Sequence, residues 1–175
     1  RRYVVAGSVG MRALDAVRDP VGFDGLIVAL SPAQLQWITR SGPGALRPEV
    51  SVCLTVDPAS DLPQEVFGRV YENTAIACVY NHADEATMHL VEDADVQEGC
   101  RAIGVGLGAP GRSDLGMVGD IVVDRAFLDE RHSTALELTT QGELAEVDLG
   151  GVRDRDNRGF SLPGVRRALP LHAPA

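Results

Sequence analysis

The sequence predicts an α+β fold that is rich in β-strands, with a barrel- or sandwich-like antiparallel sheet and one or two peripheral helices. Apolar runs of about six residues recur along the chain, and clusters of Gly, Pro, Asp and Asn separate them. The clearest helix start lies at Ser31, early in the chain. The regular alternation of strands and helices that indicates a parallel, doubly wound sheet is not found in this pattern.

The N-terminal part predicts two strands followed by a helix. Residues 3–8 and 25–30 are apolar runs of strand length. Ser31 is a good N-cap, and Pro32 suits the first helical position because its missing N–H is not needed there. We expect this helix to end before residues 41–44, which are rich in Gly and Pro.

The middle of the chain predicts a series of short strands. Residues 50–56 are rich in β-branched side chains, which favour strands. Residues 66–70 and 74–80 form two more apolar runs, close enough to pair. Residues 87–91 are short and can be read either way.

The next segment predicts two strands with a loop between them. Residues 101–107 and 117–123 are the strands, and residues 104–116 contain the Gly- and Pro-rich loop. Residues 124–132 are compatible with one or two helical turns. The glycines of this loop do not form a dinucleotide-binding motif, because Pro110 follows them and no helix opens there.

The last part predicts a hairpin and then an arm. Residues 134–140 and 143–149 are β-compatible and flank the dipeptide Gln141-Gly142, which suits a two-residue turn. We therefore predict one β-rich globular domain over residues 1–149. Residues 150–175 are rich in Arg, Asp, Gly and Pro, and they predict an extended C-terminal arm.

Composition excludes several classes of function. The net charge of −9 and the pI of about 4.8 argue against a nucleic-acid partner, which requires clustered cations. All 16 basic residues are Arg, so lysine-based chemistry is excluded for this chain. No apolar stretch is long enough for a membrane helix. Three sparse cysteines, Cys53, Cys78 and Cys100, are typical of reduced thiols and predict a cytoplasmic location.

His82 is the first candidate for a catalytic group. It directly follows an apolar strand, where the sheet holds the backbone and the ring can reach a cleft. Asp84 or Glu85 is near enough in sequence to orient the ring. The alternative is a solvated histidine in a turn. The spacing of these residues and His89 matches no metal-binding motif, so we predict neither a metal site nor a cofactor.

Ser133 is a candidate nucleophile at the start of a predicted strand. A serine needs a base within hydrogen-bonding reach. The neighbouring His132 is a poor base because adjacent side chains of a strand point to opposite faces, whereas His82 comes from another strand. Glu146, on the second strand of the predicted hairpin, could orient the histidine as the third member of a triad. Alternative acids are Glu137 and Glu143.

These motifs together resemble a known family of proteases. The turn Asn81-His82-Ala83-Asp84 looks like the histidine turn of herpesvirus assemblins and tailed-phage prohead proteases, and residues 143–149 resemble the strand that closes the prohead protease core. The resemblance implies a β-barrel serine endopeptidase of capsid maturation, with His82 as base, Ser133 as nucleophile and Glu146 as third member. The assemblin order would favour Ser113 with His132 instead.

Two hypotheses of function therefore stand side by side. One is a capsid-maturation serine protease, a hydrolase that acts on a protein substrate. The other is a non-catalytic β-barrel domain for binding or assembly, with a protein partner. Neither involves nucleic acid or a membrane. Because apolar strands leave sheet edges that need protection, a homo-oligomer is a further expectation.

Overall fold

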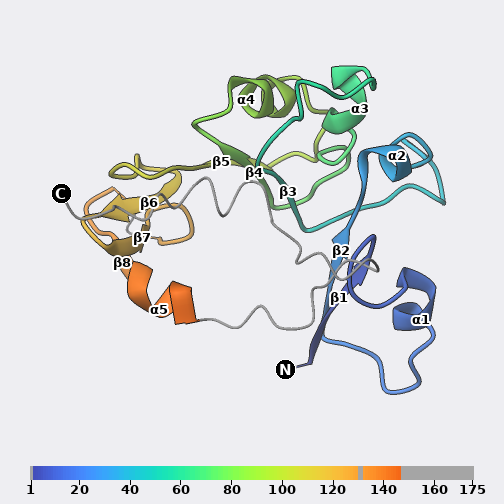
Figure 1. Cartoon of the computed structure of the whole chain (residues 1–175), viewed down its shortest axis with the longest axis horizontal. Coiled ribbons are helices and arrows are strands. Elements are labelled where there is room, and N and C mark those ends of the chain that lie inside the picture. Colours follow the sequence, from blue (N-terminus) through green and yellow to red (C-terminus); the bar gives the residue numbers. More distant parts are fainter. Residues whose placement is uncertain (1, 130–131, 147–175) are drawn as a thin grey trace.

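The computed structural model describes residues 2–129 and 132–146 (Figure 1). Its strands are β1 (Tyr3–Gly7), β2 (Gly25–Ala29), β3 (Val50–Cys53), β4 (Ala77–Asn81), β5 (Arg101–Val105), β6 (Asp114–Val118), β7 (Ile121–Asp124) and β8 (Leu136–Thr140). Its helices are α1 (Ala13–Val17), α2 (Pro32–Leu35), α3 (Gln64–Gly68), α4 (Glu85–Glu92) and α5 (Gln141–Glu146). The predicted arm, residues 150–175, lies outside the described residues.

The strands form two sheets. β1 and β2 pair in parallel, and the other six strands follow one another in the order β3-β4-β5-β6-β7-β8. The pairs from β3 to β6 are parallel, and β6-β7 and β7-β8 are antiparallel. The predicted β-rich α+β class is confirmed. The barrel is not, because β3 and β8 have one neighbour each within the described sheet and stay open edges.

The parallel part is a β-α-β-α-β unit, which the sequence had argued against. Residues 66–68 belong to α3 instead of a strand, and residues 87–91 belong to α4. The buried residues of α4, Thr87 and Leu90, are three positions apart, which is helical spacing. Both helices lie on one face of β3-β5, as Figure 1 shows. Their apolar runs are too short to separate helix from strand by periodicity.

Helices α3 and α4 enclose the main hydrophobic core. Phe67, Tyr71, Cys78 and Leu90 form its buried cluster against the sheet. The Tyr71 hydroxyl lies 2.8 Å from the carbonyl oxygen of Val79, so its polar end is satisfied while its ring is fully buried. A second buried cluster is formed by three small or branched residues, Ala77, Ile103 and Ala126.

The antiparallel part differs from its prediction at two points. Residues 117–123 are divided between β6 and β7 by a turn at Gly119, whose φ of 65° favours glycine. Residues 141–146 form α5, so the predicted hairpin around Gln141-Gly142 is wrong. Glu143 accepts the backbone N–H of Thr140 at 3.0 Å, which anchors the start of that helix. Residues 147–149 lie outside the described part of the chain.

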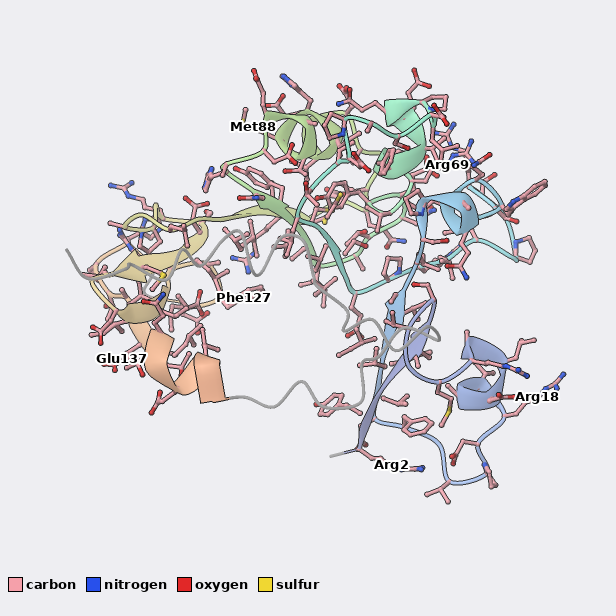
Figure 2. The ribbon with its side chains drawn as sticks, in the orientation of Figure 1. Arg2, Arg18, Arg69, Met88, Phe127 and Glu137 are labelled. Atoms are coloured by element: carbon pink, nitrogen blue, oxygen red, sulfur yellow. The ribbon has the colours of Figure 1, made fainter. Side chains whose placement is uncertain are left out.

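The predicted helix at Ser31 is confirmed, and it connects the N-terminal part to the core. Ser31 and Gln34 form a capping box, and Pro32 opens α2. Arg69, the residue that follows α3, donates to the carbonyl oxygen of Gln36 at 2.7 Å, and Figure 2 shows its position beside α2. Arg40 and Glu72 add an ion pair of 2.7 Å between the same two segments.

The β1-β2 pair is built around a close approach of backbone. Gly7 has a φ of 114°, and a Cβ there would lie 2.1 Å from the carbonyl oxygen of Ala29. Glycine is therefore required where β1 turns toward α1. Across the described residues, none of the helices has the length and apolar character needed to cross a membrane.

Candidate functional site

A cleft of about 1200 Å³ opens at the carboxyl ends of β3, β4 and β5. The last residues of β4 and β5 and the segments that follow the three strands, residues 54–56, 81–86 and 105–110, form much of its wall. The β6-β7 hairpin, Leu144 of α5, Pro58 and Gln64 also line the cleft. Ligands of open α/β sheets bind at this edge, because the loops after parallel strands converge there. We call it the β3-β5 cleft.

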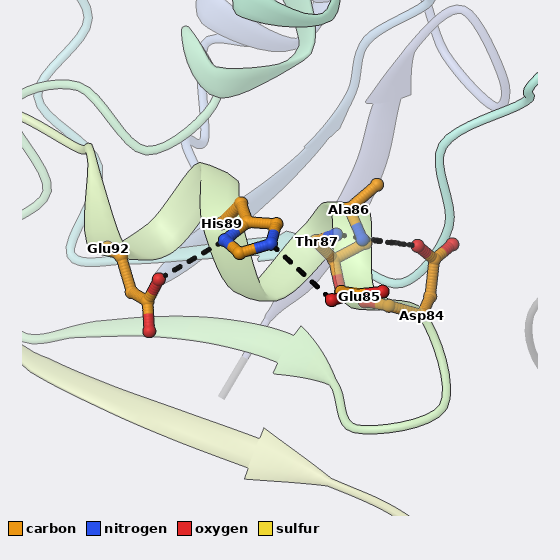
Figure 3. A network of polar contacts seen from close by, with 6 residues as sticks. All are labelled: Asp84, Glu85, Ala86, Thr87, His89 and Glu92. Carbon is orange, nitrogen blue, oxygen red and sulfur yellow. Dashed lines mark hydrogen bonds and ion pairs between the residues drawn. The ribbon is translucent and has the colours of Figure 1, made fainter.

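The turn between β4 and α4 shapes one wall of the cleft. Asp84 caps α4 by accepting the backbone N–H groups of Ala86 and Thr87, and its other oxygen accepts that of Val56 at 3.1 Å. Asn81 donates to the carbonyl oxygen of Leu54 at 3.0 Å. The two side chains hold the turn to the segment after β3, and Figure 3 shows Asp84 at the start of α4.

His82 projects from this turn and meets a carboxylate from another strand. Its Nε2 lies 3.3 Å from Oδ2 of Asp114, the first residue of β6. Asp114 also accepts the backbone N–H of Gly104 and of Gly111, each at 3.1 Å. The imidazole remains 44% exposed, and it packs against the ring of Tyr80 with a centroid distance of 5.2 Å and an angle of 70° between the ring planes. The predicted orienting residues, Asp84 and Glu85, therefore do not hold this ring.

Two glycines make room for the His82–Asp114 pair. A Cβ on Gly104 would lie 2.1 Å from Nε2 of His82 and 2.8 Å from Oδ1 of Asp114. A Cβ on Gly111 would lie 2.6 Å from Oδ2 of Asp114. Any other residue at either position would displace the pair, so the backbone of β5 and its loop is fitted to these two side chains.

The cleft combines apolar walls with negative charge. Its apolar lining includes Val56, Val105 and Met117. Its ionisable lining residues are His82 and the three acids Asp84, Glu85 and Asp114, and no arginine is found among the described residues that line it. A neutral group can be accommodated there, whereas a lone carboxylate or phosphate would be repelled.

His89 contacts two acidic neighbours on its own helix. It lies on the exposed side of α4, with Nδ1 3.3 Å from Glu92 and Nε2 3.7 Å from Glu85 (Figure 3). These contacts follow from helical spacing of three and four residues, so this histidine belongs to a surface charge network. Within the described residues there is no group of three side chains suited to hold a metal ion.

The three predicted triad residues occupy separate parts of the chain. His82 lines the cleft. Ser133 is exposed and is not among the described residues that line it. Glu146 ends α5, and its side chain lies outside the described part. Asp114, the partner of His82, was missed, because only the pairing of β5 with β6 brings it beside Gly104.

Comparison with known proteins finds relatives that are named as ligases. The chain is 47% identical to a protein of Leifsonia xyli subsp. xyli over 155 residues, which is 85% of this chain and 30% of that protein. It is 38% identical to one of Streptomyces coelicolor, over 99% of this chain and 36% of that protein. A Tropheryma whipplei protein is 42% identical, over 85% and 32% respectively.

Each of these relatives is named UDP-N-acetylmuramoylalanine–D-glutamate ligase. The chain spans about a third of the length of these curated relatives. No profile of a known protein family matches it.

The relatives overturn the resemblance to capsid-maturation proteases. They are ligases, so the expectations of a hydrolase, a serine endopeptidase and a role in capsid maturation are wrong, and so is the non-catalytic β-barrel alternative as it was framed. The expectation of a protein substrate or partner is also wrong, since the names specify two small molecules. The turn around His82 misled because four residues at a strand end are common to many folds.

Proposed function

We propose that this chain forms one segment of a ligase that joins UDP-N-acetylmuramoylalanine to D-glutamate, and that the β3-β5 cleft is part of its substrate site. The similarity carries this proposal, because it extends over 85–99% of the chain at 38–47% identity. The position of the cleft supports it, since the carboxyl edge of parallel strands is where such sheets bind small molecules.

The negative charge of the cleft fits a segment of an enzyme in which other segments also contribute to the substrate site. The two molecules in the relatives' name carry a diphosphate and carboxylates, which need cationic or N–H partners. The chain has no lysine, and the described lining of the cleft has three acids without an arginine. We infer that the anionic groups of the substrates are held by groups outside this lining, and that the cleft receives an uncharged part of a substrate.

The proposed reaction forms an amide from a free carboxylate and the amino group of D-glutamate. This condensation is uphill in water, so it needs an activating co-substrate of the nucleoside triphosphate class. The oxygen that the carboxylate loses would leave as inorganic phosphate. For the location of the protein we retain the cytoplasm, because Cys53, Cys78 and Cys100 are free thiols.

The direct test is a hybrid enzyme in which this chain replaces the matching segment of the Leifsonia xyli relative. The hybrid is incubated with UDP-N-acetylmuramoylalanine, ATP, Mg²⁺ and radiolabelled D-glutamate. We expect a labelled amide from D-glutamate and none from L-glutamate. A hybrid that folds, as judged by circular dichroism, and still makes no labelled amide would contradict the proposal.

A matched pair of variants tests whether the activity of the hybrid depends on the cleft. In the hybrid, Gly104→Ala places a methyl group against His82, and we expect it to lower the rate at least about tenfold. Gly44→Ala is the control, because its nearest neighbour outside the adjacent residues is 3.8 Å away and Gly44 does not line the cleft. Equal rates for the two variants would remove the cleft from the proposal.

A further inference from the structure

The His82–Asp114 pair gives the cleft one hydrogen-bonding group whose orientation is fixed. Asp114 accepts from two backbone N–H groups, and Nε2 of His82 lies 3.3 Å from its Oδ2, so the imidazole faces a carboxylate that can only accept. This contact favours the tautomer that has its proton on Nε2 of His82. In the neutral ring this leaves Nδ1 as the acceptor.

The ring has little freedom to turn away from this arrangement. The backbone N–H of His82 donates to the carbonyl oxygen of Val105 at 3.0 Å, which extends the pairing of β4 with β5 beyond the strands. The ring then lies along the backbone of β5 between Gly104 and Gly106, whose Cβ positions would fall 2.1 Å and 3.6 Å from it. In the part of the chain that the structure describes, Nδ1 has no hydrogen-bond partner.

The surrounding charges select what such an acceptor can bind. Asp84 and Asp114 already accept backbone N–H groups, and Glu85 lies at the same end of α4. An acceptor among three acids attracts a hydrogen-bond donor and disfavours a carboxylate. The apolar walls make an exposed ammonium group a poor match as well, so a neutral N–H or O–H group is the best fit.

We propose that Nδ1 of His82 accepts a hydrogen bond from a neutral N–H or O–H group of the substrate in the β3-β5 cleft, and that Asp114 is the positioning residue for this contact. The inference rests on the proposed function, because it assumes that the cleft holds a substrate. UDP-N-acetylmuramoylalanine and ATP both carry such neutral donors, whereas D-glutamate offers only charged groups.

The first part of the test determines the tautomer of the His82 imidazole without any ligand. Long-range proton–nitrogen NMR on the 175-residue chain, labelled with ¹⁵N-histidine at about pH 8.5, reports which ring nitrogen is protonated. The His82→Asn variant assigns the signal. We expect the Nε2–H tautomer in the native chain and in Gly44→Ala, and a mixture of tautomers in Asp114→Asn and Gly104→Ala. The Nδ1–H tautomer in the native chain would overturn the proposal.

The second part adds the three molecules one at a time. UDP-N-acetylmuramoylalanine or ATP should shift the Nδ1 signal of His82, and which of them does so identifies the donor. D-glutamate alone should leave it unchanged. His82→Ala should weaken binding of the active probe about five- to tenfold, as expected for one hydrogen bond. If D-glutamate alone shifted the Nδ1 signal, the inference that the acids of the cleft disfavour a carboxylate would be wrong.

The two proposals can fail separately. If either nucleotide shifts signals elsewhere in the chain, or if the hybrid forms the amide, while Nδ1 of His82 does not respond, the role of His82 is wrong and the ligase proposal stands. If no probe shifts any signal and the hybrid forms no amide, both are wrong.

Discussion

The two parallel units of this chain use similar apolar strands in opposite ways. In the β3-β5 unit, Ile103 is fully buried and α3 and α4 cover one face of the sheet. In the β1-β2 unit, Ile27 is 59% exposed, and the buried residues up to the end of β2 are Ala6 and Ala16. An apolar run therefore predicts a strand but does not say how much surface it buries. The cleft belongs to the unit with the larger core.

The largest expected effect contrasts one isoleucine from each unit. Ile103→Ala removes a fully buried side chain and should lower the free energy of unfolding by about 2–5 kcal/mol. Ile27→Ala removes an exposed one and should cost less than about 1 kcal/mol. Urea denaturation of the two variants measures both values. Equal losses would show that the β1-β2 unit is as well packed as the β3-β5 unit.

A smaller effect tests the turn that shapes the cleft. Asp84→Ala removes the N-cap of α4 and the link to Val56, and should lower the free energy of unfolding by about 1–2 kcal/mol. Asp93→Ala, at the exposed C-cap of the same helix, should change it by less than about 0.5 kcal/mol. If Asp93→Ala destabilised the chain as strongly, the role given to Asp84 would be incorrect.

The smallest effect concerns the buried thiol beneath α3 and α4. Burial raises the pKa of Cys78 to about 12 from an ordinary value of 9.0. The unfolded thiol then releases its proton first as the pH rises, so the stabilising contribution is complete below pH 9.0 and is lost as the pH approaches 12.

Between pH 7.5 and pH 9.5 this one thiol should account for a fall of ~1 kcal/mol in the free energy of unfolding. Cys78→Ala should therefore have a shallower alkaline loss than the native chain, although it is less stable at every pH. Parallel urea titrations at both pH values provide the measurement, and identical pH slopes would refute the assignment.

Local signals in the sequence were enough to predict part of the fold. The strands at residues 25–30 and 101–107 and the helix start at Ser31 follow from apolar runs and from capping chemistry. Helices α3 and α4 could not be predicted in this way, because their few apolar residues fit both the helical and the strand period. Tertiary packing decides between the two structures. The parallel unit was missed for that reason.

Only those features of the candidate site that depend on local sequence could be predicted. The placement of His82 at a strand end correctly suggested a cleft, because the ends of β4 and β5 are adjacent. The partner of His82 could not be found from the sequence. Asp114 lies beside His82 because it pairs with Gly104 across β5 and β6. Nor could the type of reaction be derived, because a short turn at a strand end occurs in folds with many different chemistries.

Hydrogen exchange is the most direct test of the claim that the β3-β5 cleft, and not the β1-β2 unit, receives substrate. The chain is exchanged in deuterated water with and without UDP-N-acetylmuramoylalanine and ATP. We predict slower exchange at residues 81–86 and 105–110, which line the cleft, and unchanged exchange at residues 25–29. Protection confined to residues 25–29, or no protection anywhere, would contradict the account.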